Sequence, residues 1–120
     1  MEMIRLLIVD ADDQAFANYK SLSAQQGWVI DRVRMFSEVL NLNGTLSYDV
    51  AIIELALPDA LGTDVWDHLK NRYSQLVGIM TTQSSSLHKL IDPLSSGATA
   101  FLLKPVDQNT LAQIIDRALP

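Results

Sequence analysis

Short apolar runs alternate with helical patterns along the whole chain. Four runs with little internal polarity lie at 4–9, 50–53, 76–80 and 100–103, and a fifth β-rich segment at 28–34 carries three charged residues. Uninterrupted apolar runs indicate strands that are buried on both faces, as in a parallel sheet. The charged fifth segment is typical of an edge strand, where charge discourages unwanted pairing.

Helical periodicity fills the intervals between these runs. In the last interval, apolar residues recur at helical spacing after an aspartate that is suited to cap a helix. Pro93 indicates that the fourth helix kinks or ends early, because proline removes a backbone donor and clashes with the preceding turn. The helix starts are expected at Asp12 or Asp13, Ser37, Gly62, Ser84 and Asp107.

Five β-α repeats with right-handed crossovers predict one α/β domain over residues 1–120. Its architecture is a doubly wound, five-stranded parallel sheet with five helices, and 120 residues suit a single core. Sheets of this kind place their ligand sites in the crevice beyond the carboxyl ends of the strands. Candidate functional residues are therefore sought at that edge.

Composition and charge narrow the function classes. The chain has no cysteine, which excludes disulfides, Cys-ligated zinc and thiol catalysis. Its net charge is −5 and no basic stretch exceeds two residues, so nucleic-acid binding gains no electrostatic support. The first apolar run is too short for a signal peptide or a membrane span, which favours a soluble, cytoplasmic domain without membrane contact.

Two further enzyme or cofactor classes find little support. No GxGxxG motif or P-loop follows the first run, which argues against a nucleotide or flavin binder. His68 and His88 fall within helical patterns and are expected on solvated faces rather than in a catalytic site. We therefore do not predict an enzyme.

Polar side chains stand at the carboxyl ends of four predicted strands, namely Asp10, Glu54, Thr82 and Lys104. Glu54 has apolar neighbours on both sides, and carboxylates are seldom buried unless they are paired. Lys104, in the segment FLLKP, is the expected partner. A salt bridge that merely ties two strands together is the alternative to a functional site.

The segments LLIVDADD, YDVAIIELALPDALG, IMTT and GATAFLLKP resemble the receiver domains of two-component response regulators. They occur in the family's order, at fitting separations, and cover essentially the whole chain. Pro58 and Gly62 lie at the family's offsets from the phosphoacceptor position, which is Glu54 here. The resemblance implies a flavodoxin-like sheet with strand order 2-1-3-4-5.

The same resemblance implies roles for several other residues. Thr82 is the expected pocket hydroxyl, Lys104 the pocket amine and Phe101 the switch aromatic, and the bond before Pro105 is expected to be cis. The face built from the fourth helix, fifth strand and fifth helix is expected to bind a protein partner. Such a partner would be a histidine kinase, an effector or another receiver, and a homodimer falls within this expectation.

Two departures from the family pattern change the expected chemistry. Position 54 is Glu where the family has its nucleophilic Asp, and position 11, a metal-ligating acid in the family, is Ala. The extra bond moves the Glu54 carboxylate by roughly 1.5 Å, and a misplacement of about 1 Å can cost on the order of 100-fold in phosphoryl transfer. Mg²⁺ requires near-octahedral oxygen ligands, and Ala11 removes one.

We therefore expect an atypical receiver that acts through protein–protein interaction, without aspartyl phosphorylation and with no cofactor. In this hypothesis, Glu54 reaches Lys104 directly and imitates part of the phosphorylated state. The alternative is a receiver that still accepts a phosphoryl group on Glu54 or a nearby acid. In that alternative, Mg²⁺ is held by Asp10, Asp12 and Glu54, with Asp12 replacing the ligand that is lost at Ala11.

Overall fold

The computed structural model describes residues 3–42, 44, 46–83 and 97–120. The chain folds around a five-stranded parallel sheet with the order β2-β1-β3-β4-β5, which confirms the predicted α/β class and strand order. The charged strand is indeed at one edge. The strands are β1 (Arg5–Val9), β2 (Val29–Val33), β3 (Val50–Glu54), β4 (Val77–Thr82) and β5 (Ala100–Leu103).

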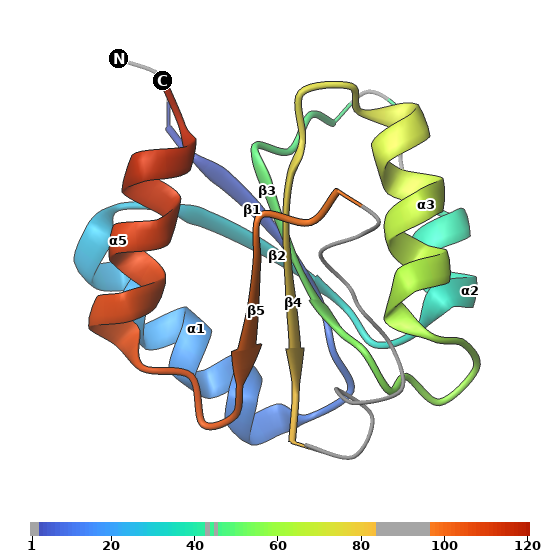
Figure 1. Cartoon of the computed structure of the whole chain (residues 1–120), viewed down its shortest axis with the longest axis horizontal. Helices are drawn as coiled ribbons and strands as arrows, with labels where there is room; N and C mark the ends of the chain where they lie inside the picture. Colours follow the sequence, from blue (N-terminus) through green and yellow to red (C-terminus); the bar gives the residue numbers. More distant parts are fainter. Residues whose placement is uncertain (1–2, 43, 45, 84–96) are drawn as a thin grey trace.

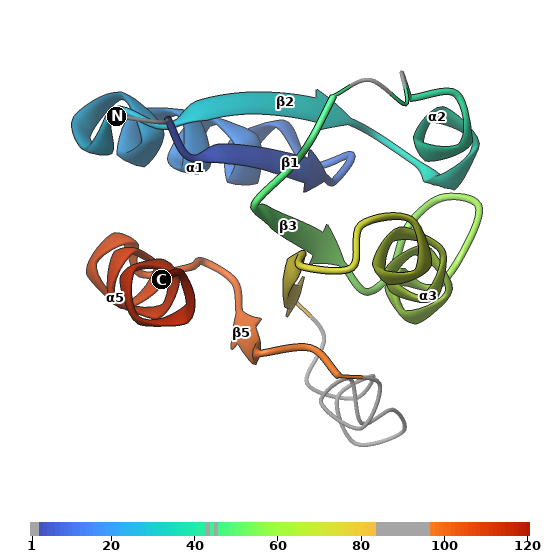
Figure 2. The same cartoon turned by 90° about the horizontal axis from the view of Figure 1, so that it is seen from above.

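Helices cover both faces of the sheet, with α1 and α5 on one side and α2 and α3 on the other (Figures 1 and 2). None of the described helices is long and apolar enough to cross a lipid bilayer. The fourth helix that the sequence predicts from Ser84 lies outside the described residues. The described helices are α1 (Asp13–Gln26), α2 (Phe36–Leu40), α3 (Gly62–Arg72) and α5 (Gln108–Ala118).

The core consists of two hydrophobic clusters that are separated by the sheet. Alternate side chains of each strand enter opposite clusters, because successive residues in a strand point to opposite faces. One cluster lies beneath α3 and contains Trp66, and the other lies beneath α1 and α5, with Trp28 packed at its margin. Since β1 and β3 are buried on both faces, their sequences are apolar at almost every position.

Capping residues fix the helices that border the predicted site. The Asp12 carboxylate accepts hydrogen bonds from the backbone N–H groups of Gln14 and Ala15 at the start of α1. Asp107 accepts a hydrogen bond from the Thr110 backbone N–H at the start of α5. Both aspartates therefore cap helices as predicted, with Asp12 rather than Asp13 capping α1.

The expectation that His68 lies on a solvated face is wrong. Its side chain is half-buried, and the ring packs edge-on against Phe36 with 5.8 Å between ring centroids. The atom Nε2 is buried and has no hydrogen-bond partner among the described residues. The His68 ring is partly buried because α2 covers this side of α3. His88 lies outside the described residues.

Candidate functional site

The β1–α1 loop brings two carboxylates to the carboxyl edge of the sheet. Asp10 follows β1 directly, and its backbone N–H donates to the Val33 carbonyl of β2 at 3.0 Å. The Asp10 side chain is 2% exposed, and its Oδ1 accepts the Asp12 backbone N–H at 2.9 Å. This local hydrogen bond turns the chain at Ala11, so that both aspartates lie beside the sheet edge.

Glu54 is the last residue of β3 and lies beneath the start of α3. It is 8% exposed, and its Oε2 accepts a hydrogen bond from the Thr81 hydroxyl at 3.2 Å. The chain passes very close to this residue at Gly62, where an added Cβ would lie 2.5 Å from the Glu54 carbonyl oxygen. Glycine at this position therefore lets α3 begin against the end of β3.

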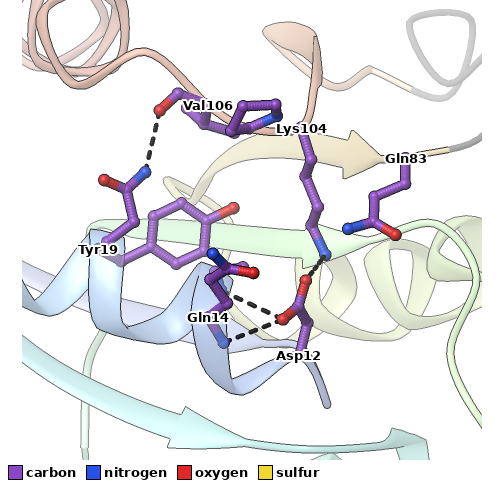
Figure 3. Close-up of a pocket in the computed structure, with 9 residues that line it drawn as sticks. Asp12, Gln14, Tyr19, Gln83, Lys104 and Val106 are labelled. Atoms are coloured by element: carbon purple, nitrogen blue, oxygen red, sulfur yellow. Dashed lines mark hydrogen bonds and ion pairs between the residues drawn. The ribbon is translucent and has the colours of Figure 1, made fainter.

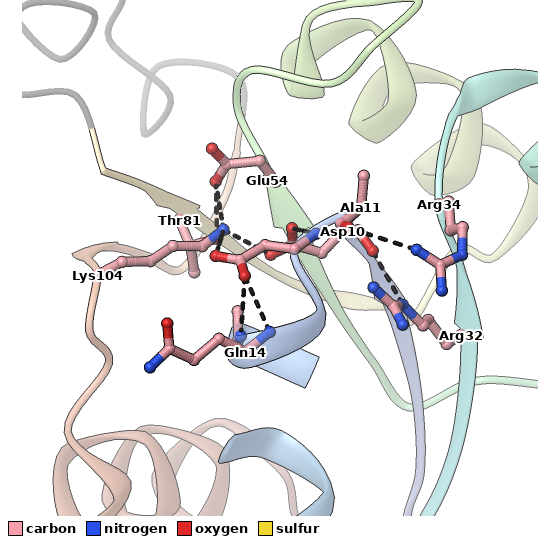
Figure 4. Close-up of polar contacts among 10 residues, drawn as sticks. Asp10, Ala11, Gln14, Arg32, Arg34, Glu54, Thr81 and Lys104 are labelled. Carbon is pink, nitrogen blue, oxygen red and sulfur yellow. Dashed lines mark hydrogen bonds and ion pairs between the residues drawn. The ribbon is translucent and has the colours of Figure 1, made fainter. Parts of the chain in front are cut away.

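Lys104 follows β5, and its ammonium group lies among three carboxylates (Figure 4). Its Nζ is 2.8 Å from Asp10 Oδ2, 3.4 Å from Glu54 Oε2 and 3.6 Å from Asp12 Oδ2. The Lys104 side chain is only 5% exposed. The predicted pair of Glu54 with Lys104 is therefore present, but the shortest contact is made by Asp10, which the sequence analysis did not pair with the lysine.

Asp10 forms a short ion pair with Lys104, and although burial alone would lower the pKa of Lys104, hydrogen bonding and charge from Asp10 both raise it. Glu54 and Asp12 add their negative charges to that of Asp10 around the ammonium group. Such an arrangement keeps the ammonium charged in a site that excludes most water.

Burial and charge shift the pKa values of this cluster in different directions. For Glu54, burial raises the pKa, and the Asp10 charge adds to the rise, while Lys104 offsets only part of it. Burial alone would lower the pKa of Lys104, but the neighbouring Asp10, Glu54 and Asp12 raise it overall. The pKa of Asp12 is lowered: slight burial opposes this, but the backbone N–H of Ala15 and the Lys104 charge outweigh it.

The hydroxyl that contacts Glu54 belongs to Thr81, which the sequence analysis missed. Thr81 lies opposite Glu54 in the β3–β4 register, so the two side chains share one face of the sheet. Thr82, the predicted hydroxyl, is one residue further along and 1% exposed, and its carbonyl accepts the Lys104 backbone N–H at 2.9 Å. Strand alternation identifies Thr81 once the register is known, whereas the role of Thr82 stays a prediction.

Two other residues from the family pattern are located by the structure. The Lys104–Pro105 bond is cis, as predicted. Phe101 lies on β5 opposite Met80, is half-buried and packs against the cluster beneath α3. Its role as a switch aromatic stays a prediction.

The donor set does not suit an octahedral Mg²⁺ site. Ala11 contributes no side-chain oxygen, and the acids Asp10, Asp12 and Glu54 converge on an ammonium group. Within the described ranges, no group of three or more His, Cys, Asp or Glu residues is arranged to hold a metal ion. Weak or absent Mg²⁺ binding stays a prediction.

Two cavities border the ammonium group. One, of about 390 Å³, opens beside Asp10, Ala11 and Glu54. The other, of about 590 Å³, lies between α1 and the segment that follows β5, with Asp12 and Lys104 on its wall (Figure 3). Because Asp12, Lys104 and Gln83 line both cavities, the Lys104–Asp12 ion pair forms part of the boundary between them.

Comparison with known proteins shows the family to which the chain belongs. The response regulator receiver domain family matches residues 6–116. The response regulator protein PilR of Pseudomonas aeruginosa is 33% identical over 86 residues, which are 72% of this chain and 19% of that protein. The regulatory protein AtoC of Escherichia coli is 24% identical over 115 residues, which are 96% of this chain and 25% of that protein. The chain thus spans about a fifth to a quarter of these two relatives.

Solved structures agree with the fold. A CheY-like response regulator receiver domain from Methanospirillum hungatei superposes with a TM-score of 0.85 at 26% identity, over 97% of this chain and 93% of that chain. A putative response regulator from Chloroflexus aurantiacus gives a TM-score of 0.85 at 22% identity, over 98% of both chains.

Family, relatives and fold lead to one assignment. Receiver domains are signalling modules that interact with proteins such as kinases and effectors, and phosphotransfer is part of their function without making them conventional enzymes. The matched region includes every strand residue from Leu6 onward and all four described helices, except for the last two residues of α5, Arg117 and Ala118. The chain belongs to the response regulator receiver domain family of two-component signalling.

Proposed function

We propose that this receiver domain signals by binding a protein partner without forming an aspartyl phosphate. The observation that carries this proposal is the surroundings of Lys104, whose Nζ lies 2.8 Å from Asp10, 3.4 Å from Glu54 and 3.6 Å from Asp12. In a receiver that is phosphorylated, this amine would bind a phosphoryl oxygen. Here it is surrounded by carboxylates of the chain itself.

The chemistry of phosphoryl transfer supports the same proposal. Transfer depends on positioning and on neutralisation of the charge that develops on the phosphoryl oxygens. Glu54 presents its carboxylate on a longer side chain than aspartate, and Ala11 cannot help to hold a neutralising cation. An incoming phosphoryl group would also meet the carboxylates of Asp10 and Asp12.

The Glu54–Lys104 contact suggests that the domain rests in one state. A carboxylate beside Lys104 supplies about one negative charge and two oxygens, whereas a phosphate supplies nearly two charges and three oxygens. The contact therefore imitates the phosphorylated arrangement only in part. A constitutive conformation of this kind would suit a domain whose activity is set by the presence of its partner.

Phosphorylation of the isolated domain tests the proposal. The protein is incubated with acetyl phosphate or with a histidine kinase, with and without Mg²⁺, and its intact mass is measured. We expect no phosphoryl adduct on the native domain. The double variant Ala11→Asp/Glu54→Asp is the matched control and should form an Mg²⁺-dependent adduct, because it regains both family residues. An Mg²⁺-dependent adduct on the native domain that disappears in Glu54→Gln or Asp10→Asn would establish the phosphoaccepting alternative instead.

For the partner, we propose the face that includes β5 and α5. Leu103 on β5 is 50% exposed, β5 forms one edge of the sheet, and its other three residues are also apolar. The expected fourth helix of this face lies outside the described residues. Leu103→Asp should weaken binding to a kinase, an effector or a second copy of the chain, as measured by light scattering and by titration with candidate partners. Leu40→Asp, at a residue 54% exposed on α2, is the control and should leave binding unchanged.

A further inference from the structure

Arg32 of β2 and Arg34, which follows the end of β2, reach the β1–α1 loop from the side opposite Lys104 (Figure 4). Arg32 Nε donates to the Asp10 carbonyl at 3.0 Å, and Arg34 Nη1 donates to the Ala11 carbonyl at 3.4 Å. These are the two carbonyls of the turn that places Asp10 and Asp12 beside the sheet edge. The loop is thus bound by the arginines through its backbone carbonyls and by Lys104 through its carboxylates.

The same two arginines share a carboxylate at the start of α1. Asp13 Oδ1 lies 2.8 Å from Arg32 Nη1 and 3.0 Å from Arg34 Nη2. Both contacts lower the pKa of Asp13, with the Arg32 hydrogen bond as the largest cause. Each guanidinium therefore connects one loop carbonyl to the first residue of the helix, which fixes both ends of the turn.

Arg32 is unusually buried for a charged residue on an edge strand. Its side chain is 13% exposed, and its guanidinium lies over the Phe16 ring at 4.7 Å from the ring centroid. The atom Nη2 is buried and has no hydrogen-bond partner among the described residues. Leaving a buried donor unpaired is costly, so packing alone does not account for an arginine at this position.

We propose that Arg32 and Arg34 are positioning residues that hold the β1–α1 loop so that Asp10 and Asp12 converge on Lys104 without a bound cation. The inference rests on the proposed function and deepens it, because it names what fixes the pocket in one state. The arginines act through the loop backbone, and neither forms an ion pair with Asp10, Asp12 or Glu54. Their role is therefore separable from the charge balance at Lys104.

Amide hydrogen exchange, measured by NMR on the whole domain, tests this role. The reporter is the Asp12 amide, which donates to Asp10 Oδ1, and the internal reference is the Leu55 amide, which donates to the Thr81 carbonyl at the same sheet edge. Arg34→Met should accelerate exchange at Asp12 by about fivefold while exchange at Leu55 is unchanged. Arg34→Lys should give a smaller acceleration than Arg34→Met, because its ammonium can retain one of the two contacts, but it should not restore native exchange, because an ammonium cannot contact the Ala11 carbonyl and Asp13 together.

Arg5→Met provides the matched control, because Arg5 also forms an ion pair on β1 and β2 but at the other end of the strands. Its Nη1 lies 3.3 Å from Asp31 Oδ2, and its side chain is 34% exposed. We expect no change at Asp12 in this variant. Arg34 is 49% exposed, so its substitution is compatible with folding, whereas Arg32→Met is the more severe second variant.

The proposal is overturned if Arg34→Met leaves exchange at Asp12 unchanged, or if Asp12 and Leu55 accelerate alike. These outcomes are independent of the phosphorylation test. A domain that resists phosphorylation but shows no loop effect would retain the proposed function and lose the arginine role. A domain that is phosphorylated but shows the loop effect would lose the proposed function and retain the arginine role.

Discussion

Burial and charge oppose each other most strongly at Lys104. Moving an ammonium group out of water costs several kcal/mol, and acidic neighbours offset this cost only when they are close. Asp10 at 2.8 Å and Glu54 at 3.4 Å supply that compensation. The dependence is mutual, because Asp10 is 2% exposed and would be left without a counter-charge if the lysine were removed.

Lys104→Met should therefore lower the free energy of unfolding by about 3–5 kcal/mol, as is typical when one partner of a buried ion pair is removed. Urea denaturation followed by circular dichroism measures the loss. Lys70→Met is the control, because the Lys70–Asp67 pair is similar in length at 3.2 Å but its side chains are 38% and 58% exposed. It should cost less than about 1 kcal/mol. Equal losses in the two variants would mean that the Lys104 cluster does not stabilise the fold.

Glu54 should make stability depend on pH in a definite direction. Its pKa is raised in the folded protein above the ordinary value of 4.5, chiefly by burial, so the folded state holds the proton more tightly than the unfolded state. Its contribution to stability is complete below the unfolded-state pKa and is lost as the pH rises through the folded-state pKa. Native protein should thus lose stability relative to Glu54→Gln as the pH rises from about 4 towards neutrality.

Denaturation of both proteins over a series of pH values measures this difference. Asp59→Asn supplies a control of opposite sign, since hydrogen bonds from the backbone N–H groups of Phe36 and Ser37 lower the pKa of Asp59. The contribution of Asp59 is present above its unfolded-state pKa and is lost as the pH falls through its folded-state pKa. A pH-independent difference for Glu54→Gln would show that its carboxyl is not perturbed by folding.

At the scale of elements, the contact of α3 with β4 depends on the glycine at position 78, which has no side chain. An added Cβ at Gly78 would lie 2.6–2.8 Å from three atoms of the Trp66 ring. Trp66 is 3% exposed within the cluster beneath α3, so the ring has little room to move. The close approach of helix and strand therefore requires glycine at position 78.

Gly78→Ala should destabilise the domain by about 1–3 kcal/mol, because overpacking in a dense core displaces neighbouring groups. The measurement is the urea midpoint at constant m-value. Gly44→Ala is the control: within the described part of the chain, its added Cβ would meet the end of the flexible Arg72 side chain, at 2.9 Å. We expect Gly44→Ala to change the urea midpoint only slightly. Similar losses at positions 44 and 78 would contradict the packing explanation.

The elements that could be predicted are those whose signal is local. Buried parallel strands require apolar side chains on both faces, so the runs that became β1 and β3 stand out in the sequence. Asp12 and Asp107 were recognisable as caps because a cap is decided within three residues. The short helix α2 was harder: it begins at Phe36 rather than Ser37, and its first N–H groups are bound by Asp59 from a distant loop.

The features that escaped prediction depend on register between strands. Thr81 and Thr82 are equivalent in sequence terms, and only the pairing of β3 with β4 places Thr81 opposite Glu54. Arg32 and Arg34 were interpreted as charges that protect an edge strand, whereas they contact the neighbouring loop. Arg34 lies one residue beyond the end of β2, and a spacing of two residues is that of side chains on one face of a strand, which is a signal that could have linked them.

At the scale of the whole molecule, both hydrophobic clusters share the same strands. Residues of β1 and β3 contribute alternately to the cluster beneath α3 and to the cluster beneath α1 and α5. Neither cluster can lose its packing without exposing the sheet that supports the other. A domain of this size with a shared sheet is expected to unfold in a single cooperative transition.

The two tryptophans allow this coupling to be tested, because Trp66 belongs to the cluster beneath α3 and Trp28 packs against the other cluster. In Trp28→Phe the remaining Trp66 reports on the cluster beneath α3, and in Trp66→Phe the remaining Trp28 reports on the cluster beneath α1 and α5. Within each variant, the fluorescence and circular dichroism midpoints in urea should coincide. The double variant Trp28→Phe/Lys104→Met should unfold at a lower urea concentration than Trp28→Phe. The midpoint measured by Trp66 fluorescence should fall by as much as the midpoint measured by circular dichroism, although the Lys104 ammonium group lies outside both hydrophobic clusters. Separate midpoints would show that the faces unfold independently, and that the charge cluster at the sheet edge stabilises only the part of the fold beside it.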